Sequence, residues 1–158
     1  AVPSKTLKQL DEFARAWILQ RSLALAKAIN MTTMDAIRKA LAEGFAEGES
    51  IQQLSKRIEG YFEGNAKYRA EMISRTETIA ASNAGAVDRY AKEGIKQKEW
   101  FAALDERTRD THAAANGQIV GVDEDFKVGG DSMSAPGQGS DPSENINCRC
   151  VVLPVIPD

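Results

Sequence analysis

The side chains with the greatest chemical capacity in this sequence lie in its C-terminal half. The sequence holds one histidine, His112, and two cysteines, Cys148 and Cys150. An imidazole and two thiolates are ligands that Zn²⁺ accepts, and Asp105 precedes His112 by about two turns on one face of a predicted helix. Cysteines two positions apart on a strand point to the same face. These four residues are therefore candidate ligands of a zinc ion.

Two other interpretations of the histidine and the cysteines stay open. Structural zinc sites usually show CxxC-type spacing, so both cysteines could instead pack as small hydrophobes, with His112 bonded to a backbone carbonyl. A thiolate nucleophile would need the histidine beside one cysteine and an orienting group, which Asp105, Asn145 or Asn147 could provide. A bond between the two cysteines would close a strained ring, so no disulfide is expected and a reducing compartment is indicated.

Charged residues form the second candidate set. Arg75 and Glu77 lie two positions apart on a predicted helix, about 200° around its axis, so each needs a partner elsewhere. Asp105 and Arg109 have the spacing of an ion pair at a helix start. We predict that five residues form a buried polar network that joins distant segments of the chain: Arg75, Glu77, Asp105, Arg109 and Arg149.

The same residues permit a rival, enzymatic hypothesis. Asp105, His112 and the arginines could serve a metal-assisted nuclease or an ADP-ribosyl transferase. Hydrolysis of phosphodiesters usually needs convergent carboxylates that bind metals, and the sequence points to no second carboxylate beside Asp105. The glycines at 129–130 and 137–139 do not match a phosphate-binding motif. We therefore favour a structural role over an enzymatic one.

Hydrophobic periodicity predicts the elements that position these residues. Four helices are expected first, at 4–29, from about 32 to 48, at 50–62 and at 66–93, with Ser4, Thr32, Ser50 and Asn65 as N-caps. A strand at 95–102 follows, with Trp100 and Phe101 at its buried end. Then come a short helix at 106–115 capped by Asp105, a strand at 118–122, a loop at 129–145 and an edge strand at 148–155. The predicted fold class is α+β: about four helices, the last one long, then a small mixed unit of about three short strands and one short helix.

Composition bounds the function without deciding it. The 158 residues carry a formal net charge of −3, with 42% hydrophobic and 27% charged residues, as in an ordinary globular protein. This charge does not favour non-specific nucleic-acid binding, and no apolar run approaches the roughly 20 residues that a membrane span needs. The chain begins Ala1-Val2-Pro3 rather than with Met, as a fragment with residues missing upstream would.

An ordered set of short motifs gives the sequence its most specific likeness. It resembles the phage head morphogenesis family typified by the F protein of phage Mu, whose members are often called minor head or minor capsid proteins. The resemblance covers about residues 66–155, and we divide the chain into an N-terminal helical region, 1–65, and a Mu F-like domain, 66–158. The matching residues, in order, are Arg75-Thr76-Glu77-Thr78, Asn83, Tyr90, Gly94, Lys98-Glu99-Trp100, Asp105-x-Arg107-Thr108-Arg109-x-x-His112, Gly117, Phe126 and Asn147-Cys148-Arg149-Cys150.

This resemblance implies a minor head protein of a tailed phage or prophage, acting in procapsid assembly near the portal. The implied partners are the portal protein, scaffold or major capsid subunits, together with packaged or ejected DNA, and no membrane. The implied location is the virion, in the capsid interior or portal region, after assembly in the bacterial host cytoplasm. No cofactor is implied beyond the zinc candidate. Many relatives have a cysteine-containing version of the Asp105–Arg109 segment and a histidine before the final cysteines, where this sequence has Thr108, Arg109 and Ile146.

Overall fold

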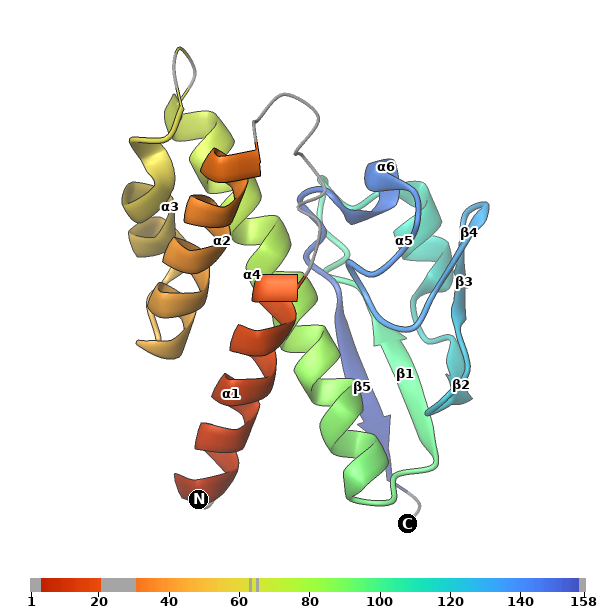
Figure 1. The fold of residues 1–158 in the computed structure, drawn as a ribbon. Coiled ribbons are helices and arrows are strands. Elements are labelled where there is room, and N and C mark those ends of the chain that lie inside the picture. The colour runs from red at the N-terminus through yellow and green to blue at the C-terminus, as the bar shows by residue number, and fades with distance from the viewer. Residues whose placement is uncertain (1–3, 21–30, 63, 65, 157–158) are drawn as a thin grey trace.

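The computed structural model describes residues 4–20, 31–62, 64 and 66–156, and its long helix α4 separates a helical half from a sheet half (Figure 1). The first three helices pack on one side of α4, and a small antiparallel sheet packs on the other. The predicted α+β class is confirmed. The elements in order are α1 (Ser4–Gln20), α2 (Met31–Ala46), α3 (Ile51–Glu59), α4 (Ala66–Lys92), β1 (Gln97–Phe101), α5 (Asp110–Ala115), β2 (Ile119–Gly121), β3 (Phe126–Val128), β4 (Asp131–Met133), α6 (Pro142–Asn145) and β5 (Val151–Val155).

The helical half follows its apolar periodicity closely. Ser50 caps α3 as predicted, because its hydroxyl accepts from the N–H of Gln53 while the Gln53 side chain accepts from the N–H of Ser50. Two boundaries differ from the prediction, and one lies outside the described residues. The predicted stretch 21–29 and the Asn65 cap lie outside the described residues, and α1 ends within them at Gln20. α2 begins at Met31, so Thr32 lies inside its first turn. α3 ends at Glu59, because the N–H of Gly60 bonds back to the carbonyl of Ile58 and closes the helix before Phe62.

Helix α4 serves both halves because its two faces carry different side chains. It runs from Ala66 to Lys92, close to the predicted 66–93, and Gly94 follows it with a φ of +76°. On one face, Ala70, Ile73 and Ala81 join the core formed with α1, α2 and α3. On the opposite side, the helix presents polar groups to the C-terminal strand. A single long helix therefore carries the sheet half on the helical half.

The three-stranded sheet has the order β2-β1-β5, and all of its pairs are antiparallel. Trp100 pairs with Val152 and Phe101 pairs with Val151, so the two aromatic residues occupy adjacent registers on opposite faces. Trp100 is 0% exposed and Phe101 is 48% exposed. The prediction that both would be buried was wrong for Phe101, because successive side chains on a strand alternate between the faces.

The predicted edge position of the C-terminal strand is confirmed, and polar side chains of α4 cover its open edge. β5 pairs with β1 on one side. On its other side the Asn83 side chain donates to the carbonyls of Cys150 (3.1 Å) and Pro136 (3.2 Å) and accepts from the N–H of Val152 (3.0 Å). The hydroxyl of Tyr90 donates to the carbonyl of Val152 at 3.1 Å. These bonds satisfy backbone groups that an edge strand would otherwise leave open.

The segment predicted as an irregular loop, 129–145, contains two regular elements. β4 pairs with β3 in a small antiparallel ribbon, and α6 follows it. The Asp131 carboxylate accepts from the N–H of Ser132, the N–H of Asp141 and the hydroxyl of Ser140. The described sheet half thus has five strands, rather than about three, and a second short helix.

The start of helix α5 differs from its prediction. The helix begins at Asp110 with Arg109 at the N-cap, rather than at 106 with Asp105 as the cap. Asp105 instead holds a turn before the helix, because its Oδ1 accepts from the N–H of Arg107 and the hydroxyl of Thr108. Within the described residues, no helix combines the length and hydropathy that crossing a membrane requires.

Candidate metal centre

The histidine and both cysteines meet in the interior of the sheet half. Nδ1 of His112 lies 3.3 Å from Sγ of Cys150 and 3.7 Å from Sγ of Cys148. One ligand atom from each of the three residues falls within 4.8 Å of the others. All three side chains are buried, with 1–2% of their surface exposed. Both cysteines are free thiols in this structure.

Two local structures bring these side chains together. His112 lies on α5, where the edge of the Trp100 ring packs against the imidazole with ring centroids 5.4 Å apart. Cys148 and Cys150 lie in the approach to β5, after Asn147, whose φ is +57°. Asparagine tolerates this left-handed conformation better than most residues. The turn at Asn147 therefore directs the following cysteines toward α5.

Residues of α4 hold that turn in place. The N–H of Asn147 donates to Oγ1 of Thr76 at 3.0 Å, and its Oδ1 accepts from the Arg75 guanidinium at 3.4 Å. Arg75 also pairs with Glu71 at 2.8 Å, as the helical spacing suggests. From α5, the Arg109 guanidinium donates to the carbonyl of Ile146, the residue before the turn. Arg75 on α4 and Arg109 at the N-cap of α5 thus hold the two residues that lead into the cysteines.

The second nitrogen of His112 meets a carboxylate that sequence reasoning missed. Nε2 of His112 lies 3.0 Å from Oε2 of Glu144, and the Thr111 hydroxyl donates to the same oxygen at 2.9 Å. Glu144 belongs to α6, inside the predicted loop, so no periodic pattern marked it. The sequence pattern that could have revealed α6 is Asp141-Pro142-Ser143, which is typical of a helix start. In the structure, the Asp141 side chain accepts from the N–H of Ser143.

The two thiols have opposite proton affinities. A hydrogen bond from the Cys148 thiol, reinforced by His112, lowers the pKa of Cys150 to about 5. The same interaction, together with burial, raises the pKa of Cys148 above its ordinary range. The backbone N–H of Cys150 also donates to Sγ of Cys148 at 3.4 Å. The Cys150 sulfur therefore favours the thiolate form, and the thiol proton of Cys148 stabilises that thiolate.

A small cavity adjoins the three side chains. Its volume is about 10 Å³, close to what one water molecule occupies. Asp105 lines the cavity but is exposed, and the structure does not place its carboxylate among the three ligand atoms that converge. The N–H of Arg107 is the main cause that lowers the pKa of Asp105, and the positive charge of Arg149 contributes. Asp105 is thus a neighbour of the cluster across the cavity.

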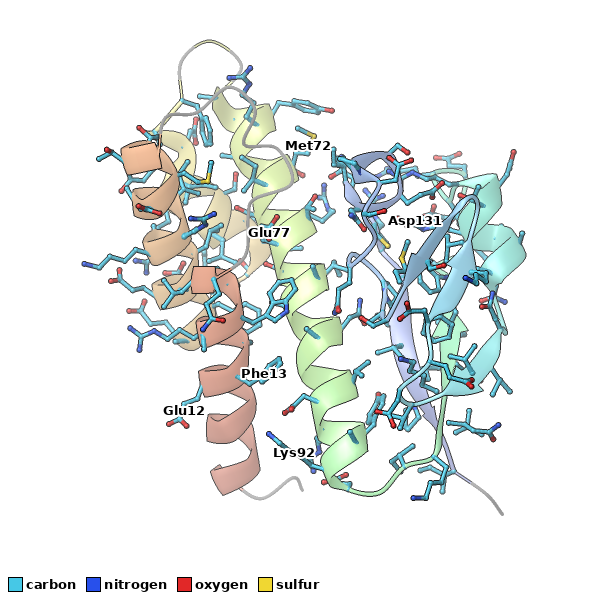
Figure 2. The ribbon with its side chains drawn as sticks, turned by 45° about the vertical axis from the view of Figure 1, so that its right-hand side comes forward. Glu12, Phe13, Met72, Glu77, Lys92 and Asp131 are labelled. Carbon is cyan, nitrogen blue, oxygen red and sulfur yellow. The ribbon has the colours of Figure 1, made fainter. Side chains whose placement is uncertain are left out.

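The five residues of the predicted polar network occupy two places. Arg75 and Glu77 lie on α4, and Glu77 is buried. Figure 2 labels Glu77 beside this helix and Asp131 in the sheet half. Arg109, Arg149 and Asp105 line the cavity. The contacts of Arg75 and Arg109 converge on two consecutive residues, the side chain of Asn147 and the carbonyl of Ile146. The role of these residues as a stabilising network remains a prediction.

Comparison with known proteins identifies related chains. The family described as Phage Mu protein F like protein matches residues 35–153. The minor head protein GP7 of Bacillus phage SPP1 is 33% identical over 141 residues, which cover 85% of this chain and 46% of that protein. The uncharacterized protein YqbB of Bacillus subtilis (strain 168) is 29% identical over 98% of this chain and 52% of its own length. This chain therefore spans about half the length of these two relatives.

A third relative carries an enzyme's name. The NAD(+)--arginine ADP-ribosyltransferase EFV of Enterococcus faecalis is 36% identical over 117 residues, which cover 72% of this chain but 24% of that protein. No solved structure matches the chain with significance.

Proposed function

The chain belongs to the Phage Mu protein F like family, and from that premise we propose that it is the conserved part of a minor head protein that acts in phage head morphogenesis. In this proposal it works during procapsid assembly near the portal, in the host cytoplasm, and stays in the virion. Its partners are the portal protein, scaffold or major capsid subunits. The observation that carries the proposal is the 33% identity to the SPP1 minor head protein over 85% of this chain.

An exposed apolar face of the sheet supports a role in an assembly. Phe101, Ile119, Val151 and Leu153 are between 37% and 50% exposed. Phe101 pairs with Val151, while Leu153 and Ile119 pair with Glu99 on either side, so all four lie on the face opposite Trp100. Contiguous apolar surface on a monomer is typical of a contact with another protein. We assign this face to contact with another structural protein of the head.

Genetic replacement in the phage or prophage that encodes the chain tests the proposal. Removing the reading frame should lower the yield of infectious particles, and the protein should be found by mass spectrometry in purified wild-type virions. A Phe101→Asp substitution should reduce its incorporation, because a charge on the apolar face opposes burial against a partner. Tyr68→Ser is the matched control, since Tyr68 is also an exposed aromatic residue, at 63%, but lies near the start of α4.

Two results would contradict the head role, and a third would contradict the assignment of the sheet face. One is absence of the protein from both procapsids and virions. The second is normal particle yield without the gene. The third is equal incorporation of the Phe101 and Tyr68 variants into virions. This result would exclude the sheet face as the contact surface but would not contradict a role in the phage head. Contact with packaged DNA is the remaining part of the proposal, and the net charge of −3 restricts it to a local site.

The enzymatic alternative has less support. The matching segment makes up 24% of the Enterococcus transferase, so most of that protein has no counterpart here. In the cluster, one nitrogen of His112 faces the thiols and the other faces Glu144, which leaves neither directed at a substrate. Incubation of the purified chain with NAD⁺ and arginine, or with plasmid DNA and Mg²⁺, is expected to give no product.

A further inference from the structure

We propose that His112, Cys148 and Cys150 bind one zinc ion, with Glu144 orienting the imidazole and solvent occupying the fourth position. This inference rests on the geometry of the buried cluster and does not depend on a role in the phage head. The three side chains come from α5 and from the approach to β5, so the ion would join two segments that are distant in the sequence.

The spacing of the ligand atoms fits tetrahedral zinc. With Zn–S near 2.3 Å and Zn–N near 2.05 Å, a tetrahedral site places nitrogen and sulfur about 3.6 Å apart. The Nδ1–Sγ distances are 3.3 Å to Cys150 and 3.7 Å to Cys148, on either side of that value. The two nitrogen–sulfur distances therefore need adjustments of only a few tenths of an ångström to admit the ion.

The surroundings of His112 favour a nitrogen lone pair that points toward the thiols. Nε2 lies 3.0 Å from the Glu144 carboxylate, although the two groups are not aligned as a hydrogen bond in this conformation; a proton on Nε2, beside that carboxylate, would leave Nδ1 as the acceptor. Histidine ligands of zinc commonly donate their other N–H to a carboxylate in this way. The Thr111 hydroxyl holds the same carboxylate oxygen at 2.9 Å. Glu144 thus lies where an outer partner of the imidazole would be placed to select its tautomer.

The cavity gives the fourth ligand its place. At about 10 Å³ it has room for about one water molecule beside the sulfur atoms. Asp105 lines the same cavity, but its Oδ1 is engaged by the N–H of Arg107 and the hydroxyl of Thr108. Water is therefore the fourth ligand in this proposal. Two thiolates neutralise the charge of the ion, which allows it to be held in a buried position.

A cysteine, a histidine and a carboxylate that lie in a row can also activate the thiol as a nucleophile. The burial of the two cysteines favours a zinc site over a nucleophile. Cys148 and Cys150 are 1% and 2% exposed, so a substrate would have no access to either sulfur in this conformation. A metal ion needs only the space between the ligands. The nucleophile is therefore the alternative that the experiment must distinguish.

The full chain, purified without chelator or nickel, provides the test. Elemental analysis after dialysis against zinc should find about one zinc per chain, and Cys148→Ser and Cys150→Ser should each lose it. Co²⁺ should give thiolate-to-metal charge-transfer bands and the strong visible bands of tetrahedral coordination. Glu144→Gln should keep the stoichiometry but weaken affinity about 10- to 100-fold. Asp105→Asn is the matched control and should leave both unchanged.

A second measurement covers the case in which the serine variants fail to fold. Zinc should raise the Tm of the wild-type chain and a chelator should lower it, because an ion that binds only the folded state stabilises that state. No change of Tm in excess zinc, together with no retained metal, would overturn the proposal. Rapid alkylation of Cys150 in zinc-treated protein would also overturn it and favour the nucleophile, whereas protection of both thiols by zinc supports the site.

Discussion

The two cores on either side of α4 are built from different kinds of side chain. The helical core consists mainly of alanine, isoleucine, leucine and methionine, with Ile37 and Leu54 almost fully enclosed and Ser55 of α3 as a small buried polar residue. The sheet half also has an apolar cluster around Trp100 and Phe126, but it encloses Lys98, His112 and Asn145 as well. Apolar contacts are non-directional, whereas each buried polar group needs a partner at a defined distance and angle. The helical half should therefore tolerate changes of shape that the sheet half does not.

Asn83 provides the largest test of this difference. Asn83→Leu keeps the branched shape of the original side chain but removes three hydrogen bonds, which leaves the carbonyls of Cys150 and Pro136 and the N–H of Val152 without this partner. We expect a loss of about 3–9 kcal/mol in the free energy of unfolding, at roughly 1–3 kcal/mol for each of the three groups. Denaturant unfolding followed by circular dichroism measures it.

Ile58→Leu is the matched change in the helical core. It conserves volume at a fully buried apolar position, and we expect it to cost less than about 1.5 kcal/mol. Equal losses for the two variants would break the comparison, because they would show that the polar clamp at Asn83 is no more demanding than apolar packing. Ser82→Ala, beside Asn83 but exposed, should have almost no effect.

The contrast also explains which parts of the molecule could be predicted from the sequence. The helix at 66–92 and the strand around Trp100 were predicted because their apolar periods are long or clear. β3, β4 and α6 were missed because they are only three or four residues long and the segment depends on side-chain bonds to the backbone. Asn145, for example, holds Gly139 by accepting from its N–H and donating to its carbonyl. Such bonds have no period that a sequence could reveal.

The candidate site divides in the same way. His112, Cys148 and Cys150 were recognised because histidine and cysteine are rare here, with one and two copies in the sequence. Glu144 was missed because it is one of 23 acidic residues and nothing in its neighbours points to an imidazole. Its role appears only once α6 brings it within 3.0 Å of His112. Rare residue types reveal the centre of a site, but its supporting groups require the fold.

Gly137 gives the second test, at a close contact between the sheet half and α4. Its φ is +85°, and a Cβ built there would lie 2.9 Å from Cβ of Ala80. Gly137→Ala should cost about 2–4 kcal/mol, because the left-handed conformation and the steric overlap both oppose a side chain. Thermal and denaturant unfolding measure the change.

Gly130→Ala is the control for that prediction. A Cβ at Gly130 meets no atom within 4 Å, and no positive φ in the left-handed range opposes it. It should change stability by no more than about 0.5 kcal/mol. A similar loss of stability for both variants would mean that any alanine in the 129–145 segment is destabilising. The close contact with Ala80 would then not explain the effect of Gly137→Ala.

Lys98 gives the smallest and most discriminating effect. Its side chain is fully enclosed, and its Nζ donates to the carbonyl of Ser134 at 2.8 Å and lies 5.3 Å from the centre of the Phe126 ring. Lys98→Met removes a charge that is costly to bury, but it also removes the partner of that carbonyl. The two effects oppose each other, so at neutral pH we expect a net change within about 1 kcal/mol.

The pH dependence of the same variant is the sharper measurement. Burial lowers the pKa of Lys98, against the opposing influence of Asp125, Asp123 and Glu124. Between this lowered pKa and the unfolded value near 10.4, the unfolded chain binds the proton more tightly, so wild-type stability gains from Lys98 as the pH rises. At alkaline pH, the free energy of unfolding of the wild type should therefore rise relative to that of Lys98→Met. The exposed Lys127→Met is the control, and it should show no such change with pH. A difference independent of pH would show that the Ser134 carbonyl and the nearby acids compensate for burial, and that the polar groups of the sheet half have no electrostatic cost.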